Sequence, residues 1–364
     1  MKITNIATDH FLIPLPTVLT DSTHGQMPHF ELVTCRLESD SGASGLGYSY
    51  TVGAGAAAIH SLITKELTPL LIGADPRCIE KIWKEMWWRL HYVGRGGLVS
   101  FALAAVDIAL WDLKARCADE PLWRFLGGHD PRVKVYAGGI DLHMPLDQLH
   151  EQTERNLARG FRAIKMKVGR DNLAEDIARV KAMREHLGPD IVLMTDANMV
   201  WSVEKAIRAS HAFAEYDVYW LEEPTIPDDI EGHRRIEREG RVPVASGENL
   251  HTIYEFQKMI GDAGIAFPEP DMTTLGGITP WLKVAHLAEA HNRPVTTHGV
   301  HDLHVHLLAA IPNASYLEAH GFGLEAYLKH PMRIQDGVTF APERSGHGVE
   351  FDWDKLFAAI AKRV

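Results

Sequence analysis

The stretch IVLMTDANMVWSVEKAIRASHAFAEYDVYWLEEP, residues 191–224, decides the fold class. Its apolar runs at residues 191–196 and 218–221 have the length and composition of buried strands. Residues 202–214, between them, place apolar side chains at helical spacing. A strand, a helix and a second strand in this order predict one βα unit of a parallel sheet.

The same alternation continues on both sides of this stretch, at intervals of roughly 20–30 residues. Eight strands alternating with helices predict a parallel (β/α) barrel over residues 129–330. An open, doubly wound sheet is the weaker alternative, because no GxGxxG motif follows any of the strands. The strand candidates are residues 133–136, 163–168, 191–196, 218–221, 244–246, 266–271, 294–297 and 315–317.

The first third of the chain has a different pattern. Strand-like residues precede and follow SDSG at 39–42, which resembles a hairpin turn, and a helical pattern runs from about residue 53 to residue 127. Residues 1–128 are therefore predicted to form a small α+β domain with a polar loop at 19–29. The tail, residues 331–364, is predicted to leave the barrel and pack back on this domain.

The composition narrows the range of partners. The 364 residues are 46% hydrophobic, which suffices for a barrel and a second domain, and the net charge of -11 argues against nucleic acid and anionic membranes. Three cysteines without CxxC spacing indicate a reducing compartment. Because we find neither a signal peptide nor a membrane span, we expect a soluble, cytoplasmic protein.

Ionisable residues stand at the ends of seven successive predicted strands. In a (β/α) barrel these ends meet at one mouth, where function resides. Like charges that converge there resist burial unless a cation or a substrate pairs them. The residues are Lys165 and Lys167, Asp196, Glu222, Glu248, Asp271, His298 and Glu318.

Three of these residues are carboxylates on neighbouring strands. Asp196, Glu222 and Glu248 would form an all-oxygen site, and Asn198 follows directly after the first of them. Magnesium prefers octahedral oxygen ligation and keeps positions open for water or substrate. The sequence therefore predicts a Mg²⁺ site.

Two further pairs suit proton transfer. Lys165 and Lys167 point to the same face of their strand, and two adjacent ammonium groups are expected to depress each other's pKa. Asp271 and His298 end adjacent strands, so the carboxylate is expected to hold the imidazole in one tautomer. A metal facing such bases suits removal of a proton next to a carboxylate, because it stabilises the enediolate product.

Six motifs in this region resemble barrel motifs of the enolase superfamily. The Lys-x-Lys pattern with the Asp/His pair is similar to the mandelate racemase subgroup, and the resemblance extends over nearly the whole chain, including GRGG at 94–97. It implies a modified (β/α) TIM-type barrel with an N-terminal α+β capping domain that the C-terminal tail completes. The motifs are KMK at 165–167, TDAN at 195–198, EEP at 222–224, SGEN at 246–249, GGI at 276–278 and THG at 297–299.

The resemblance also implies a role for each site residue. Asp196, Glu222 and Glu248 would bind Mg²⁺. Lys167 and His298 would be the acid/base pair on opposite faces of the substrate, with Asp271 orienting His298. Contacts to the substrate carboxylate would come from Lys165 and Glu318, and Asn198 would line the same site.

The loop at 19–29 departs from mandelate racemase, whose corresponding loop is apolar. Its polar side chains favour a polyhydroxylated substrate, and His24, His29 and Arg95 are candidates for its distal end. The chain resembles acid-sugar dehydratases of the talarate/galactarate type most.

Three alternatives stay open at this point. The same residues would serve a dehydratase of an aldonate or aldarate, giving a 2-keto-3-deoxy acid, or a racemase, epimerase or cycloisomerase of a hydroxy acid. A non-catalytic sugar-acid binding protein is the third. The family resemblance further implies a homo-oligomer built from dimers, in some members an octamer.

Overall fold

An antiparallel sheet opens the chain in the computed structural model, which describes residues 1–320 and 322–361. Strands β1 (Ile3–Thr20), β2 (Gln26–Ser39) and β3 (Ser44–Thr51) lie in the order β1-β2-β3. The predicted hairpin turn connects β2 to β3, with Ser39 N donating to Ala43 O at 2.9 Å. Only residues 21–25 separate β1 from β2, so the predicted loop at 19–29 is too long, and His29 lies within β2, opposite Pro14.

Helix α4 (Leu98–Cys117) packs closely against β3, because β3 carries two glycines where the elements meet. A Cβ atom on Gly45 or Gly47 would lie 2.1 Å from the carbonyl oxygens of Ala109 and Ala105, respectively. This packing fixes β3 relative to the helical part of the unit. The other helices here are α1 (Ala56–Ser61), the π-helix Leu62–Leu67, α2 (Thr68–Leu71), α3 (Ile79–Leu90) and α5 (Leu122–Phe125).

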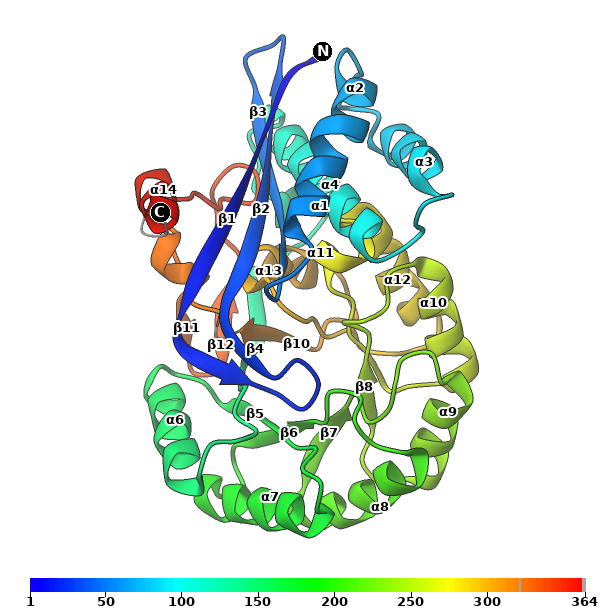
Figure 1. Ribbon diagram of the computed structural model, residues 1–364, viewed down its shortest axis with the longest axis vertical. Helices are drawn as coiled ribbons and strands as arrows, with labels where there is room; N and C mark the ends of the chain where they lie inside the picture. The colour runs from blue at the N-terminus through cyan, green and yellow to red at the C-terminus, as the bar shows by residue number, and fades with distance from the viewer. Residues whose placement is uncertain (321, 362–364) are drawn as a thin grey trace.

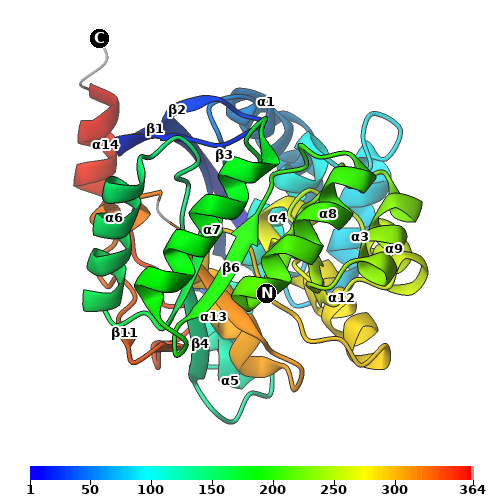
Figure 2. The same cartoon turned by 90° about the horizontal axis from the view of Figure 1, so that it is seen from below.

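A ring of parallel strands follows, with helices on its outside (Figures 1 and 2). The order β4-β5-β6-β7-β8-β9, with β10 paired to β4, confirms the predicted (β/α) barrel. The strands are β4 (Arg132–Gly138), β5 (Ala163–Lys167), β6 (Val192–Asp196), β7 (Val218–Glu222), β8 (Val244–Ser246), β9 (Phe267–Pro268) and β10 (Tyr316–His320).

The helices alternate with these strands as predicted. Asn172, Ser202, Asp229 and Thr252 cap four of them through side-chain oxygens that accept backbone N–H groups. The helices are α6 (Leu146–Ala158), α7 (Leu173–Leu187), α8 (Val203–Phe213) with the 3-10 turn Ala214–Tyr216, α9 (Ile230–Glu239), α10 (Ile253–Lys258) with the π-helix Met259–Ala263, α11 (Met272–Leu275), α12 (Ile278–Ala290) and α13 (His301–Ala310).

The predicted seventh strand, residues 294–297, is not a regular strand. Its backbone still connects the two neighbouring segments of the barrel. Thr296 N donates to Pro268 O, at the end of β9, at 3.1 Å, and Val295 forms an isolated parallel bridge with Ala314, just before β10. The sixth strand is also shorter than predicted: β9 ends at Pro268, and Asp271 instead caps α11. Short hydrogen-bonded pieces thus close the barrel on this side.

The tail divides between the two units. After the 3-10 helix Leu324–Tyr327, β11 (Ile334–Gln335) and β12 (Val338–Phe340) extend the barrel sheet, with β12 antiparallel to β4. This part of the tail contradicts the prediction that it leaves the barrel. Helix α14 (Trp353–Ala361) does pack on the first unit, with the Phe357 ring 5.3 Å from that of Phe11 (Figures 1 and 2). The predicted boundaries at residues 128 and 330 stay a prediction.

Buried side chains fill the barrel below its mouth. The Tyr136 and Trp220 rings meet edge to face with centroids 5.3 Å apart, a favourable aromatic geometry. The same buried hydrophobic cluster also contains Ala163, Met194, Ala245 and Phe267. Within the described part of the chain, none of the helices has the length and apolarity that crossing a membrane requires.

Candidate active site

Three carboxylates converge at the barrel mouth. Asp196 and Glu222 end β6 and β7 and are fully buried, and Glu248 follows two residues after the end of β8. One oxygen from each lies within 4.8 Å of the others. Such close like charges repel strongly in a buried site unless a cation lies between them.

The donor set fits Mg²⁺. All three groups are carboxylates, the hard oxygen ligands that magnesium prefers. Glu248 Oε2 is buried and makes no hydrogen bond among the described residues, although His298 Nε2 lies 3.3 Å away, so a cation could bind this oxygen. Asn198 N donates to Asp196 Oδ1 at 2.8 Å and helps to orient this carboxylate.

The two lysines of β5 contact the carboxylate triad, which consists of Asp196, Glu222 and Glu248. Lys165 Nζ lies 2.5 Å from Glu222 Oε1 and 2.8 Å from Glu318 Oε1, and Lys167 forms an ion pair with Asp196. Burial lowers the pKa of each lysine, but the neighbouring carboxylates outweigh it and raise both above the usual range. Lys165 does lower the pKa of Lys167, as predicted, but the carboxylates outweigh this effect, so the net shift of each lysine is opposite to the expected one.

His298 and Asp271 form the predicted pair, with Nδ1 3.1 Å from Asp271 Oδ2. The backbone N and hydroxyl of Thr273 donate to Asp271 Oδ1 at 2.7 and 2.6 Å and fix the carboxylate. Burial lowers the pKa of His298, but Glu248, Asp271 and Glu318 together raise it to about 10. A cation on the triad would offset the contribution of Glu248.

The two predicted acid/base groups approach the triad from opposite flanks. Lys167 contacts Asp196, which comes from β6, and His298 Nε2 lies 3.3 Å from Glu248 Oε2, beyond β8. The carboxylate triad therefore lies between the lysine and the imidazole. A molecule bound there can exchange protons on two faces.

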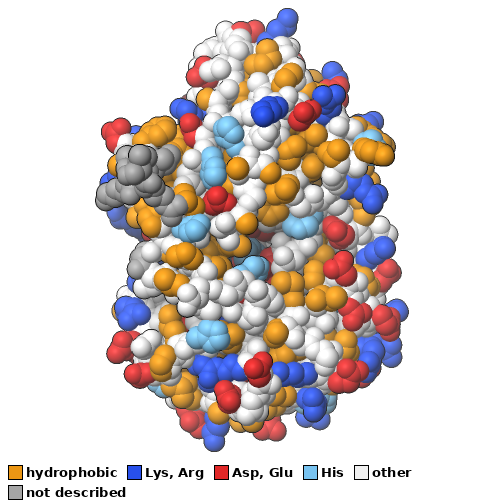
Figure 3. Space-filling view, viewed as in Figure 1, with side chains coloured by type: hydrophobic (Ala, Val, Ile, Leu, Met, Phe, Trp, Pro, Cys, Tyr) orange, Lys and Arg blue, Asp and Glu red, His pale blue; other side chains and the backbone are white. Residues whose placement is uncertain are grey.

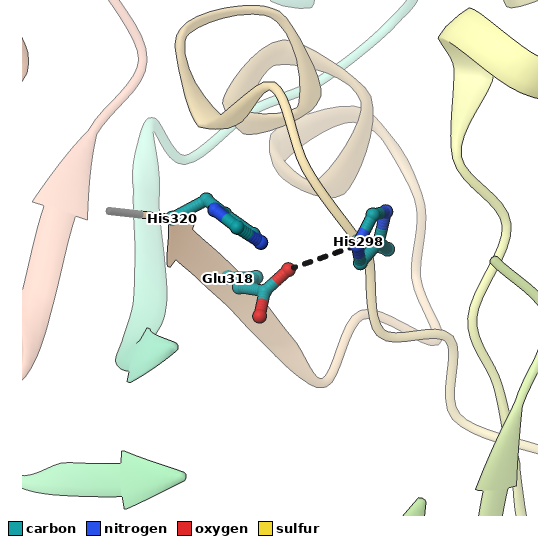
Figure 4. Close-up of side chains that lie close together, drawn as sticks. All are labelled: His298, Glu318 and His320. Carbon is teal, nitrogen blue, oxygen red and sulfur yellow. Dashed lines mark ion pairs between the residues drawn. The ribbon is translucent and has the colours of Figure 1, made fainter. Parts of the chain in front are cut away.

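Strand β10 supplies two further groups, drawn with His298 in Figure 4. Glu318 Oε2 lies 4.0 Å from His298 Nε2, and the His320 ring meets the His298 ring edge to face at 5.4 Å. Ligand atoms of all three lie within 4.8 Å of one another. Because Asp271 engages His298 and Lys165 engages Glu318, we assign no second metal to this group.

Three buried residues of the site escaped the sequence analysis. Glu269 and His320 stand two residues from Asp271 and Glu318, so the strand period of two was a signal for both. Glu269 Oε1 accepts from the Tyr136 hydroxyl at 3.2 Å below the mouth. The third, Tyr50, comes from β3 and carried no such signal.

The three predicted distal contacts have different surroundings. In the loop after β1, His24 Nδ1 pairs with Asp21 Oδ2 at 2.8 Å, and Ser22 Oγ donates to Ala197 O at 3.0 Å, which places this loop beside Asp196. His29 lies close to Gly53, and a Cβ atom on this glycine would be 3.5 Å from His29 Nε2. Arg95 is exposed, and its side chain makes no hydrogen bond or ion pair within residues 1–320 and 322–361.

The surface is hollowed between the N-terminal unit and the barrel, with histidine side chains at the edge (Figure 3). Residues 4–127 match the mandelate racemase / muconate lactonizing enzyme N-terminal domain, and residues 148–355 match the enolase C-terminal domain-like family. The chain belongs to the enolase superfamily. The predicted fold, a modified barrel with an N-terminal capping domain, is confirmed by this match.

Individual members of the superfamily align over almost their full length. A 3,6-anhydro-alpha-L-galactonate cycloisomerase of Streptomyces coelicolor is 56% identical, covering 97% of this chain and 98% of that one. The crystal structure of a racemase from Streptomyces coelicolor A3(2) with bound magnesium has a TM-score of 0.96 at 56% identity, covering 98% and 99% of the two chains. L-Talarate dehydratase from Polaromonas sp. JS666, complexed with Mg and L-glucarate, has a TM-score of 0.93 at 36% identity, covering 98% and 96%.

These similarities confirm the predicted superfamily and the predicted cofactor. The protein is an enolase-superfamily enzyme, and its predicted cofactor, Mg²⁺, is the metal in both solved structures. The predicted dehydratase reaction is supported only in part, because the 56% identical relative is a cycloisomerase. The role of each site residue and the oligomeric state stay predictions.

Proposed function

We propose that the protein removes the proton alpha to the carboxylate of a sugar acid and expels the oxygen on the β-carbon, giving a 2-keto-3-deoxy acid. One observation carries the proposal: Lys167 and His298 contact the carboxylate triad from opposite flanks. A substrate between them exposes its α-proton to one group and its departing oxygen to a proton donor.

The chain's own residues divide this task. When bound, Mg²⁺ on Asp196, Glu222 and Glu248 would supply positive charge to stabilise the enediolate. Lys165, next to Glu318, would fix the substrate carboxylate. Lys167 or His298 would take the α-proton. His298 would give a proton to the β-oxygen, which leaves poorly without one.

The nature of the β-oxygen decides the overall reaction. Where it is a free hydroxyl, water leaves and the enzyme is a dehydratase. Where it closes an anhydro ring, the carbon–oxygen bond breaks, the oxygen takes up the proton and stays in the molecule, and the product is an isomer of the substrate. Enol tautomerisation then gives the 2-keto acid in both cases.

We favour ring opening of a 3,6-anhydro sugar acid, because the 56% identical relative is named for this isomerisation. The polar loop after β1 supports a hydroxylated substrate, and its His24 is already paired with Asp21. Dehydration of an acid such as L-talarate is the second candidate, supported by the 36% identical dehydratase.

The test is a substrate panel with Mg²⁺: 3,6-anhydro-L-galactonate, L-talarate, galactarate and mandelate. Product 2-keto acids are detected as semicarbazones, mass spectrometry separates isomerisation from loss of water, and circular dichroism detects racemisation of mandelate. We expect the anhydro acid to give a keto acid of unchanged mass. Absence of keto acid from every sugar acid, or faster turnover of mandelate, would overturn the proposal. Exchange of the α-proton without elimination would indicate a racemase or epimerase.

A further inference from the structure

We propose that Tyr50 of the capping domain is a positioning residue for the His298–Asp271 pair of the barrel. This inference rests on the proposed role of His298. The Tyr50 hydroxyl donates to Asp271 Oδ2 at 3.1 Å, and its oxygen lies 3.3 Å from His298 Nδ1. The phenol, the carboxylate and the imidazole thus form a triangle of contacts across the two domains.

These three contacts determine that Nδ1 of His298 carries a hydrogen atom. Thr273 occupies Asp271 Oδ1, so Oδ2 is the oxygen that faces Tyr50 and His298. Burial and the nearby Asp271 raise the pKa of Tyr50 well above its usual value, so the residue stays a phenol. Its one proton goes to Asp271, and its oxygen lone pair is left facing His298 Nδ1.

Both neighbours of His298 Nδ1 are therefore acceptors. Nδ1 must carry a hydrogen, and this hydrogen is shared between Asp271 Oδ2 and the Tyr50 oxygen. Nε2, which lies 3.3 Å from Glu248 Oε2, is left as the nitrogen that exchanges protons at the triad. Tyr50 thereby adds a second fixed contact to the ring, beyond the one that Asp271 provides.

The surrounding backbone is adapted to this contact. A Cβ atom on Gly299 would lie 2.6 Å from both the Tyr50 hydroxyl oxygen and Asp271 Oδ2, and Gly299 has a φ of +82°. Only glycine permits the approach at no steric cost. The Tyr50 ring also packs against Phe322, with centroids 5.3 Å apart, so the phenol has little freedom to turn away.

Tyr50→Phe tests the inference, because it removes the hydroxyl and keeps the ring. Tyr48→Phe is the matched control: Tyr48 lies two residues earlier on the same face of β3, and its buried hydroxyl has no hydrogen-bond partner in the described part of the chain. We expect Tyr50→Phe to lower kcat about tenfold, the effect of one hydrogen bond. KM should change by about twofold or less, because the substrate contacts remain. Tyr48→Phe should change neither.

A second measurement does not depend on turnover. In protein with ¹⁵N-labelled histidine, the Nδ1 proton of His298 gives a signal that is assigned by its loss in His298→Asn. We expect Tyr50→Phe to shift this signal and to speed its exchange with solvent, while Tyr48→Phe leaves it unchanged. An unchanged signal with unchanged kcat in Tyr50→Phe, or equal effects of both variants, would overturn the inference. If the wild type converts no sugar acid, the proposed function fails, and the NMR comparison still decides the role of Tyr50.

Discussion

Asp271→Asn gives the sharpest test of the acid/base pair, because the environment of Asp271 is fully defined. The carboxylate accepts four hydrogen bonds: two from Thr273 at 2.7 and 2.6 Å, and one each from Tyr50 and His298 at 3.1 Å. Asparagine keeps the oxygen that Thr273 binds, but it places an NH₂ group at the position of Oδ2. Tyr50 and His298 Nδ1–H then face a donor.

The magnitude follows from these contacts. Losing the charge-assisted bond to His298 costs about 1.5–3 kcal/mol, which is about 10–150-fold in rate. The imidazole also moves its hydrogen to Nε2 to accept from the new amide, so the wrong nitrogen faces the substrate. In serine proteases the matched Asp→Asn change lowers kcat about 10⁴-fold for this reason. We therefore expect kcat to fall by about 10²–10⁴-fold, with KM changed about threefold or less.

The assay is keto-acid formation from the best sugar acid at saturating Mg²⁺. Thr273→Val is the control, since it removes only the hydroxyl bond to Oδ1 and should stay within about tenfold of the wild type. A kcat for Asp271→Asn close to that of the wild type, or an effect confined to KM, would show that Asp271 does not act through His298.

Three further predictions concern the metal, the two bases and stability. Asp196→Asn should abolish both activity and Mg²⁺ binding by calorimetry, and activity that survives exhaustive chelation would contradict the metal site. His298→Asn should abolish elimination, and exchange of the α-proton in D₂O by that variant would identify Lys167 as the base; its loss there, with exchange retained in Lys167→Ala, would identify His298. Burial lowers the pKa of His306, whose Nδ1 accepts from Trp123 N at 3.3 Å, to about 3. The unfolded chain then binds the extra proton, so stability falls as the pH drops below the ordinary pKa of about 6.5, by roughly 2–3 kcal/mol from this group between pH 7 and 4.5. Urea unfolding of wild type and His306→Gln would measure this, and equal pH dependence of the two proteins would refute it.

The capping-domain loop shows where local sequence reasoning fails in detail. Residues 19–29 are polar enough to read as one loop, yet pairing between β1 and β2 continues to Thr20 and Gln26. Strand pairing is a tertiary contact, and it overrides the local preference of polar residues. The same cause added β11 and β12 to the barrel sheet, since short edge strands form only where a neighbour offers free backbone groups.

The sequence by itself determined the βα alternation, the barrel and the residues at its mouth. Hydrophobic periodicity is a local property, and parallel strands in a barrel carry their last residues to the same end. The ordering of Lys167, Asp196, Glu222 and Glu248 around the mouth follows from this rule, without any distance being known.

Only the tertiary structure decided which charges dominate. The pKa values of Lys165 and His298 depend on distances of a few ångströms to groups on other strands, and the surrounding carboxylates raise both, which for Lys165 is opposite to the direction expected from the sequence. Tyr50 is the clearest case: it lies 221 residues from Asp271, on a sheet of the other domain, and no spacing rule connects them. Electrostatic interactions act through space, and the sequence order of the interacting groups does not reveal their separation.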